Sequence, residues 1–266
     1  MEWRKRSSER SMRHIRVVTY NTHKCRGIDG RLRPLRIVEV LREVRADIIA
    51  LQEIVSRPGP VPETDQARYI AGALGLHYVM GPVRAFRDGM YGNAVLSTFP
   101  IRATRTYDLS LVGREERGCL RADIAVGDQL LHVFNVHLGT AHEERRHQGR
   151  MLITGELLND VELSAPRLVL GDFNEWMPGL VTRLLSAHLE SADIRHHLQR
   201  SRTYPGLLPL MHLDHIYHDP ALRLDKLALH RSRRALIASD HLPLVADFGV
   251  REELPAGSPE NRNGSK

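Results

Sequence analysis

Apolar runs alternate with amphipathic segments along most of the chain. The clearest apolar runs, IRVVTYN at residues 15–21 and ADIIALQE at residues 46–53, are rich in β-branched side chains and predict buried strands. Between them, residues 34–44 carry an apolar side chain at every third position from Leu35 to Val44. This spacing places the apolar residues on one face and predicts a helix between the two strands.

The same alternation continues toward the C-terminal end. Further apolar runs predict strands at residues 93–97, 120–126, 130–138, 167–174, 212–218 and 243–250. Helices are predicted at residues 141–163, where Gly149 and Gly155 weaken the pattern, and at 178–186, whereas Pro-rich residues 56–66 predict a loop. Strands joined by short turns mix with strands joined by helices, which favours an α/β protein with one mixed sheet or two packed sheets.

Length and composition are those of a globular protein with a large core. The 266 residues, 42% hydrophobic and 26% charged, correspond to one large domain or at most two. We expect the domain to span residues 14–250, between a disordered basic tail at residues 1–13 and a disordered tail at residues 251–266.

Three absences in the sequence bear on the compartment. No apolar run reaches the length of a membrane span, and the basic N-terminal residues lack the apolar core of a secretory signal. Cys25 and Cys119 are far apart and lack the spacing of a metal site, which favours free thiols. We therefore expect a cytoplasmic monomer without stable membrane insertion.

The net charge of +6 argues only weakly for a polyanionic partner. Residues 1–16 hold six basic and two acidic residues, and residues 251–266 hold three of each. The body of the chain, residues 17–250, is left with only +2. A basic tail of this kind is usually a solvated segment.

Polar side chains end or interrupt six of the predicted strands. They are Asn21, Glu53, Asn135 and His137, Asp172 and Asn174, Asp214, and Asp240 and His241. Taken singly, each has an ordinary explanation, such as an Asp or Asn that forms a turn or a buried histidine. Six such cases together favour a shared site, because burying unpaired carboxylates costs several kcal/mol each. Carboxylates and amides are ligands for hard cations such as Mg²⁺, and adjacent histidines supply acid, base or positive charge.

The order of these motifs resembles a known family. YN, LQE, GNAVLS, NVHL, GDFN, LDHI and SDH occur in the order found in the endonuclease/exonuclease/phosphatase family, which includes deoxyribonuclease-I-like nucleases, inositol-polyphosphate phosphatases and neutral sphingomyelinases. No single motif is specific, but seven in order are, and they cover residues 14–249. RGCL and RTYPGLLPLMHLDHIYH resemble a small bacterial branch of uncharacterised members. The resemblance implies a four-layer α/β sandwich of two packed mixed sheets flanked by helices, with the site at one rim.

The resemblance also implies a metal site. Glu53 is the main ligand by this analogy, with Asn21 beside it and Asp240 nearby or acting through water. The cofactor is Mg²⁺, with Mn²⁺ as the alternative, and either one or two ions fit the motifs. The cation would polarise a phosphoryl oxygen and stabilise the leaving oxygen.

Catalytic roles follow from the same resemblance. Asp172 orients or deprotonates the attacking water, and Asn174 holds the phosphate or the nucleophile. His241 contacts the phosphate or acts as the base, so the base is left open between Asp172 and His241, with Asp214 orienting the histidine. His137 donates to a non-bridging oxygen or the leaving group.

Two further residues are candidates for substrate binding. Asn93 and Arg117 line the substrate side by the same analogy. For Arg117, a solvated loop is an equally good explanation.

We therefore expect a Mg²⁺-dependent phosphodiesterase that uses metal-assisted in-line attack of water. A DNA endonuclease or exonuclease of the same family, a phosphomonoesterase and a non-catalytic nucleic-acid-binding module are the alternatives. Aromatic residues make up only 5% of the chain, which leaves few side chains to stack on bases. A small or lipid-linked phosphodiester is therefore favoured as substrate, with nucleic acid second.

Overall fold

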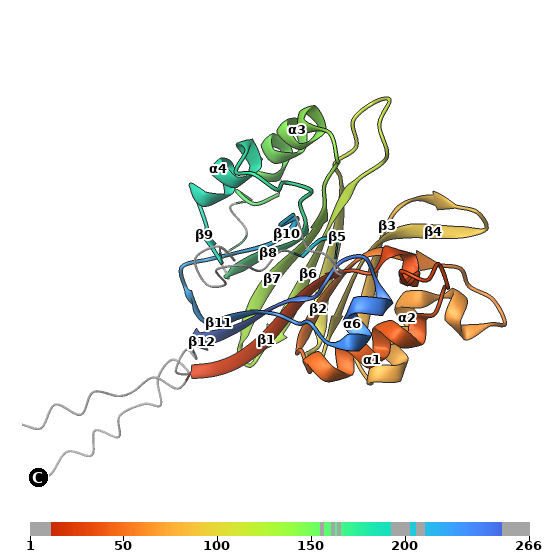
Figure 1. The fold of residues 1–266 in the computed structure, drawn as a ribbon. Coiled ribbons are helices and arrows are strands. Elements are labelled where there is room, and N and C mark those ends of the chain that lie inside the picture. Colours follow the sequence, from red (N-terminus) through yellow and green to blue (C-terminus); the bar gives the residue numbers. More distant parts are fainter. Residues whose placement is uncertain are drawn as a thin grey trace, which may run out of the picture.

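Two six-stranded sheets pack face to face, with helices on their outer faces (Figure 1). The computed structural model describes residues 12–154, 157–160, 163, 166–192, 203–205 and 211–251. The expected four-layer α/β sandwich is confirmed. The predicted tails fall almost wholly on residues 1–11 and 252–266, which lie outside the described residues, and the first and last strands start at Met12 and end at Arg251.

The first sheet contains the N-terminal strands and the last two strands of the chain. In spatial order it comprises β11 (Leu222–Leu229), β12 (Leu244–Arg251), β1 (Met12–Asn21), β2 (Ile48–Ser56), β4 (Gly89–Ser97) and β3 (His77–Phe86). Only β1 and β2 are parallel, and α1 (Pro34–Val44) connects them.

The second sheet likewise has six strands, of which one pair is parallel. It comprises β5 (Ile101–Asp108), β6 (Gly118–Val126), β7 (Gln129–His137), β8 (Arg167–Asp172), β10 (Asp214–His218) and β9 (Glu190–Ser191). Its one parallel pair, β7 and β8, is joined through α3 (His142–Leu152). Each sheet is therefore mixed, as the alternation of turns and crossover helices predicted.

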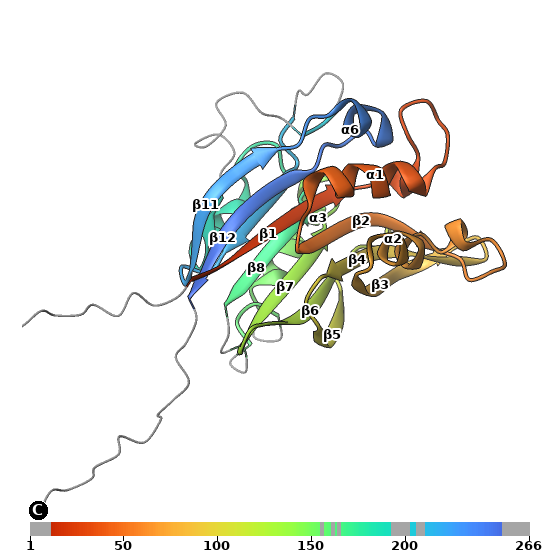
Figure 2. The same cartoon turned by 90° about the horizontal axis from the view of Figure 1, so that it is seen from below.

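Helices cover the two outer faces. On the first sheet lie α1, α2 (Gln66–Leu74) and α6 (Arg233–Ala238), and on the second lie α3 and α4 (Leu180–Ser186) (Figures 1 and 2). Short 3₁₀ turns occur at η1 (His23–Cys25) and η2 (Pro62–Thr64). No helix in the described ranges is both long and apolar enough to cross a membrane.

The predicted elements differ from the structure in two ways. The helix expected over residues 141–163 ends at Leu152, and residues 157–159 form a turn. The strands β3, β5 and β11 and the helices α2 and α6 carry no clear apolar run. In β5, for example, residues 102–106 are all exposed, so this edge strand leaves no apolar signal in the sequence.

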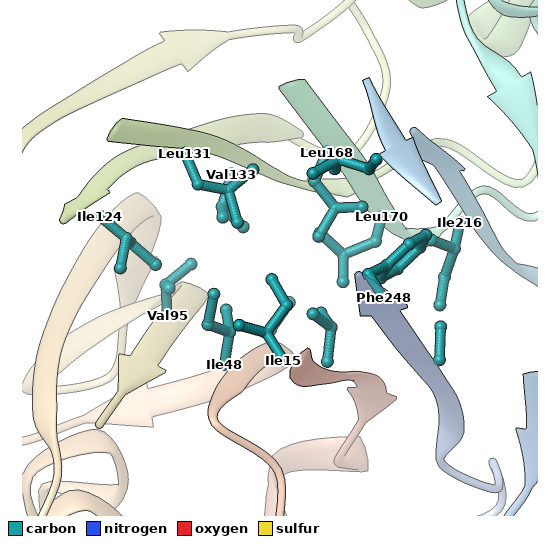
Figure 3. Close-up of a cluster of buried hydrophobic side chains, with 14 of the residues drawn as sticks. Ile15, Ile48, Val95, Ile124, Leu131, Val133, Leu168, Leu170, Ile216 and Phe248 are labelled. Atoms are coloured by element: carbon teal, nitrogen blue, oxygen red, sulfur yellow. The ribbon is translucent and has the colours of Figure 1, made fainter. Parts of the chain in front are cut away.

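The main core lies between the sheets. In one buried cluster, Ile15, Ile48 and Val95 come from the first sheet. Val133 and Leu168 of the same cluster come from the second sheet, and Figure 3 shows the side chains of both sheets turned toward one another. Burying this cluster is the main favourable term that holds the two sheets together.

Strand register places the polar strand ends at one rim. Across the second sheet, Gly118, His137, Asp172 and Asp214 are successive partners on β6, β7, β8 and β10. In the first sheet, β1 and β2 run parallel and end at the same side, so that Asn21 lies beside Gln52. The opposite rim carries the start of β1 and the end of β12.

Candidate active site

Asp172 lies at the centre of the polar cluster. It is buried, and its Oδ2 accepts a hydrogen bond from Asn21 Nδ2 at 2.9 Å, a contact that joins the two sheets. The Nε2 atoms of His137 and His241 each lie 3.7 Å from the same oxygen. The structure thus brings together side chains from β1, β7, β8 and the loop before β12.

The GDFN turn depends on a glycine. Gly171 has φ 151°, and a Cβ atom there would lie 1.9 Å from the carbonyl oxygen of Val136 on β7. Only glycine permits this close approach of β8 to β7. Beyond it, Asn174 adopts a left-handed conformation, its backbone N–H donates to Asp172 Oδ1 at 2.9 Å, and its side-chain amide donates to Leu138 O at 2.9 Å.

Glu53 is presented by a bulge in β2. The pairing of β2 with β4 shifts between Leu51 and Ile54, and Glu53 has φ 58°, which is unfavourable for a residue with a side chain. Such strain persists where neighbouring contacts hold it. Next to it, the buried Gln52 side chain donates to Asn135 Oδ1 at 2.7 Å, and Asn135 donates to the backbone oxygens of Leu51 and Ala94.

The Glu53 carboxylate is ionised at neutral pH and has cationic and amide neighbours. Its Oε1 accepts from Asn21 Nδ2 at 3.2 Å, and its Oε2 accepts from Lys24 Nζ at 2.5 Å. Burial alone would raise the pKa of Glu53, but the nearby His137 and Lys24 outweigh burial and lower the pKa to about 2.

His241 and Asp214 form a carboxylate–imidazole pair. The His241 Nδ1 atom lies 3.0 Å from Asp214 Oδ2, within hydrogen-bond reach as expected from the sequence. Burial opposes the imidazolium, but Asp214 and then Asp172 outweigh it and raise the pKa of His241 to about 10. His241 is therefore charged at neutral pH, with its Nδ1–H on Asp214 and its Nε2–H toward Asp172. The ring of Tyr204 packs beside it, with centroids 4.8 Å apart.

His137 has the opposite ionisation. Burial first, and the charge of nearby Arg117 second, lower the pKa of His137 to about 4. At neutral pH, the site therefore contains one neutral imidazole and one imidazolium, both near the same oxygen of Asp172.

Arg117 is buried rather than solvated. It is only 6% exposed, and its Nη2 pairs with Glu115 Oε2 at 2.9 Å. Its Nε and Nη1 atoms are buried without a hydrogen-bond partner among the described residues. Buried guanidinium donors without an acceptor are costly, so an anion at this position would satisfy them.

The side-chain amide of Asn93, unlike two of the Arg117 donors, has hydrogen-bond acceptors within the protein. Its side-chain amide donates to Gly118 O at 3.0 Å and to Asn135 O at 3.3 Å, between the two sheets. These contacts place the donors of Asn93 on the backbone that supports the site.

Asp240 lies close to Asn21 through Ser239. The Ser239 hydroxyl donates to the Asn21 carbonyl oxygen at 2.8 Å and lies 3.3 Å from Asp240 Oδ1. Within the described residues, no three His, Cys, Asp or Glu side chains lie close enough together to hold a metal ion by themselves. The donor set still fits Mg²⁺, which takes one or two carboxylates and fills its remaining positions with water and substrate oxygens. Lys24 already neutralises Glu53 as a cation would.

Three residues at the site were not among the sequence candidates. Lys24 contacts Glu53, the Tyr204 ring packs on His241, and His23 Nδ1 lies 3.6 Å from Asp240 Oδ1. Tyr204 lies within the RTYPGLLPLMHLDHIYH segment, but the resemblance assigned it no role, and no sequence pattern indicated Lys24 or His23.

Comparisons with known proteins identify the family of the chain. The sequence profile of the Endonuclease/Exonuclease/phosphatase family matches residues 18–241. The chain belongs to this family. An uncharacterized protein of Escherichia coli K12, YbhP, is 34% identical over 246 residues, which cover 88% of this chain and 96% of YbhP.

Solved structures of the family share the fold. The human Nocturnin catalytic domain, determined with a bound sulfate anion, superposes with a TM-score of 0.70 at 20% identity over 90% of this chain and 97% of that domain. A mannosyl-6-phosphatase of Bacteroides thetaiotaomicron has a TM-score of 0.68 at 18% identity, covering 88% and 99%. Members of the endonuclease/exonuclease/phosphatase family are hydrolytic enzymes that include phosphodiesterases, nucleases and phosphatases.

Proposed function

We propose that this protein is a Mg²⁺-dependent phosphoesterase that hydrolyses a phosphodiester by in-line attack of water. The observation that carries the proposal is the arrangement around Asp172. The side-chain amide of Asn21 donates to both Asp172 and Glu53, and Glu53 is ionised at neutral pH. The neutral imidazole of His137 and the imidazolium of His241 each lie 3.7 Å from Asp172 Oδ2.

Glu53, Asn21 and Asp240 are the residues that would hold the cation. When bound there, Mg²⁺ would supply charge stabilisation for a phosphoryl oxygen and for the leaving oxygen. The ionised state of Glu53 at neutral pH makes it ready to bind a cation without releasing a proton. Lys24 must leave Glu53 Oε2 for that oxygen to become available.

Asp172 is our choice for the group that orients and deprotonates the water. His241 is charged at neutral pH because Asp214 and Asp172 stabilise its imidazolium, so it lacks the lone pair that a base requires. Asp172 keeps an acceptor oxygen that faces both histidines and is held in place by Asn21 and the Asn174 backbone.

His241 and Arg117 are suited to binding the phosphate. The imidazolium of His241 points its Nε2–H toward Asp172, and Arg117 has two buried donors without partners in the described part of the chain. Both charges would stabilise negative charge that develops on phosphoryl oxygens during attack. His137, neutral at pH 7, can donate from one ring nitrogen to a non-bridging or leaving oxygen.

The assay compares a diester with a monoester under matched conditions. Full-length protein is incubated with bis(p-nitrophenyl) phosphate or p-nitrophenyl phosphate, with Mg²⁺, Mn²⁺ or EDTA. We expect metal-dependent hydrolysis, faster on the diester, that falls at least ~100-fold in Asp172→Asn. Asp128→Asn, an exposed carboxylate in the turn after β6, is the matched control and should leave the rate unchanged.

Four results would contradict or redefine this function. Hydrolysis that persists undiminished in EDTA or in Asp172→Asn would remove the proposed mechanism. A strong preference for the monoester would establish a phosphatase, and cleavage of plasmid DNA with a steep salt dependence would establish a nuclease.

A further inference from the structure

A basic hollow adjoins the candidate active site at Lys24. It lies between the η1 turn, the end of β2, the start of α2 and the β3–β4 hairpin. Its lining includes four basic side chains and one acidic side chain: Lys24, Arg26, Arg57, Arg87 and Glu63. Lys24 belongs to both places, because it lines the hollow and its Nζ contacts Glu53 at the catalytic cluster.

A buried glutamine fixes one wall of the hollow. Gln66, at the start of α2, is 2% exposed. Its Oε1 accepts from Val55 N at 2.9 Å, and its Nε2 donates to Lys24 O at 2.8 Å. These two bonds tie the turn that carries Lys24 to β2, so the wall is preorganised.

Two of the four cations lack a carboxylate partner among the described residues. Arg57 pairs with Asp88, whereas Arg26 donates to a backbone oxygen, that of Gly30. The Arg87 guanidinium lies over the ring of Phe86, 5.6 Å from its centroid. In the part of the chain that the structure describes, neither Arg26 nor Arg87 forms an ion pair, so both can pair with an incoming anion.

The hollow also has an apolar side. Val55 and Phe86 contribute to its lining, and so does Leu32, which is 52% exposed. A ligand that combines an anionic group with a hydrocarbon or ring portion would therefore match both kinds of surface.

We propose that this hollow binds a second anionic group of the substrate, a phosphate or a carboxylate, while the scissile phosphoryl group lies at Glu53 and Asp172. This inference rests on the proposed function and narrows its substrate to a small phosphodiester with a further anionic group. Val55 and Arg57 follow Glu53 by two and four residues at the end of β2. At ~3.3 Å per residue, the second anion lies roughly 7–13 Å from the scissile group.

The test uses two chromogenic probes that differ by one phosphate. They are thymidine 5′-(p-nitrophenyl phosphate) with a free 3′-hydroxyl and the same compound with a 3′-phosphate. The variant is Arg26→Gln combined with Arg87→Asn, since asparagine tolerates the left-handed backbone of residue 87 (φ 55°). The matched control is Arg102→Gln with Lys226→Gln, two exposed cations on β5 and β11 that remove the same charge.

We expect the wild-type protein to favour the 3′-phosphorylated probe by about tenfold or more in kcat/KM, as one or two charge-assisted contacts allow. The Arg26/Arg87 variant should lose most of this ratio, and the control should keep it. A wild-type ratio near one, or an unchanged ratio in the Arg26/Arg87 variant, would overturn the proposal.

Calorimetric binding of thymidine 3′,5′-bisphosphate separates this inference from the proposed function. If neither probe is hydrolysed but the bisphosphate binds the wild type about tenfold more tightly than the Arg26/Arg87 variant, the hollow is an anion site and the hydrolytic function is wrong. Equal affinity for the two proteins would refute the hollow as an anion site, whatever the hydrolysis results.

Discussion

The Asp214–His241 pair provides the sharpest test of the site. The pKa of His241 is raised from 6.5 to about 10, and the histidine is 5% exposed, so solvent screens the interaction little. A rise of this size corresponds to ~5 kcal/mol of favourable coupling to the protonated form. Asp214 acts on His241 both by its charge and by its hydrogen bond, so Asp214→Asn should remove at least half of the coupling, ~2–3 kcal/mol.

The sign of the pH dependence follows from the raised pKa. The stabilisation is fully present below pH 6.5, where His241 is protonated in both the folded and the unfolded protein. It is lost as the pH rises through about 10, where the folded protein also releases the proton. The difference in unfolding free energy between the wild type and Asp214→Asn should therefore be largest near pH 6 and shrink steadily toward pH 10.

Urea unfolding of both proteins at several pH values measures this difference, and NMR of the imidazole nitrogens gives the pKa of His241 directly. Turnover by Asp214→Asn should fall by roughly two to four orders of magnitude, with Mg²⁺ affinity nearly intact.

Asp123→Asn is the control, since Asp123 pairs with buried His132 at 2.6 Å, five residues along β7 from His137. The lowered pKa of Asp123 keeps its carboxylate ionised over the pH range of the comparison, and turnover by Asp123→Asn should stay near that of the wild type. A wild-type His241 that titrates near pH 6.5 would refute the reasoning.

Three further changes test the metal ligand, the turn and the support of the site. Glu53→Gln should fold normally but bind Mn²⁺ at least ~10-fold more weakly in a calorimetric titration, because a hard cation prefers a charged oxygen; equal affinity would exclude Glu53 as a ligand. Gly171→Ala should lower stability by several kcal/mol in thermal melts, because its Cβ has no room. By contrast, a Cβ at Gly72 on α2 would meet nothing within 4 Å beyond its own helix backbone, so Gly72→Ala should be neutral or stabilising by ~1 kcal/mol. Asn135→Ala should cost ~2–4 kcal/mol in urea unfolding, because it removes the bond from the buried Gln52 amide and the two bonds that Asn135 donates to the backbone oxygens of Leu51 and Ala94; a loss below ~0.5 kcal/mol would contradict that account.

Sequence patterns were sufficient where one segment carries its own signal. The helix at residues 34–44 has the predicted bounds, because its apolar stripe and Pro34 are local features. Buried strands such as β2 and β7 appear as apolar runs, because both of their faces are covered. The edge strand β5 was missed, because most of its side chains face solvent and its pairing with β6 depends on residues distant in sequence.

The candidate site, too, was predicted from the sequence only in part. The residue types and their order along the chain indicated an oxygen-rich and imidazole-rich cluster, because each motif ends or interrupts a recognisable strand. Only the tertiary structure showed that His241 and His137 carry opposite ionisation, because that depends on burial and on neighbours distant in the chain. The contact of Lys24 with Glu53 and the basic hollow beside it likewise arise where β2 meets the η1 turn and the β3–β4 hairpin. No local sequence pattern predicts these contacts, because a charged side chain in a loop acquires its partner only after the sheets have packed.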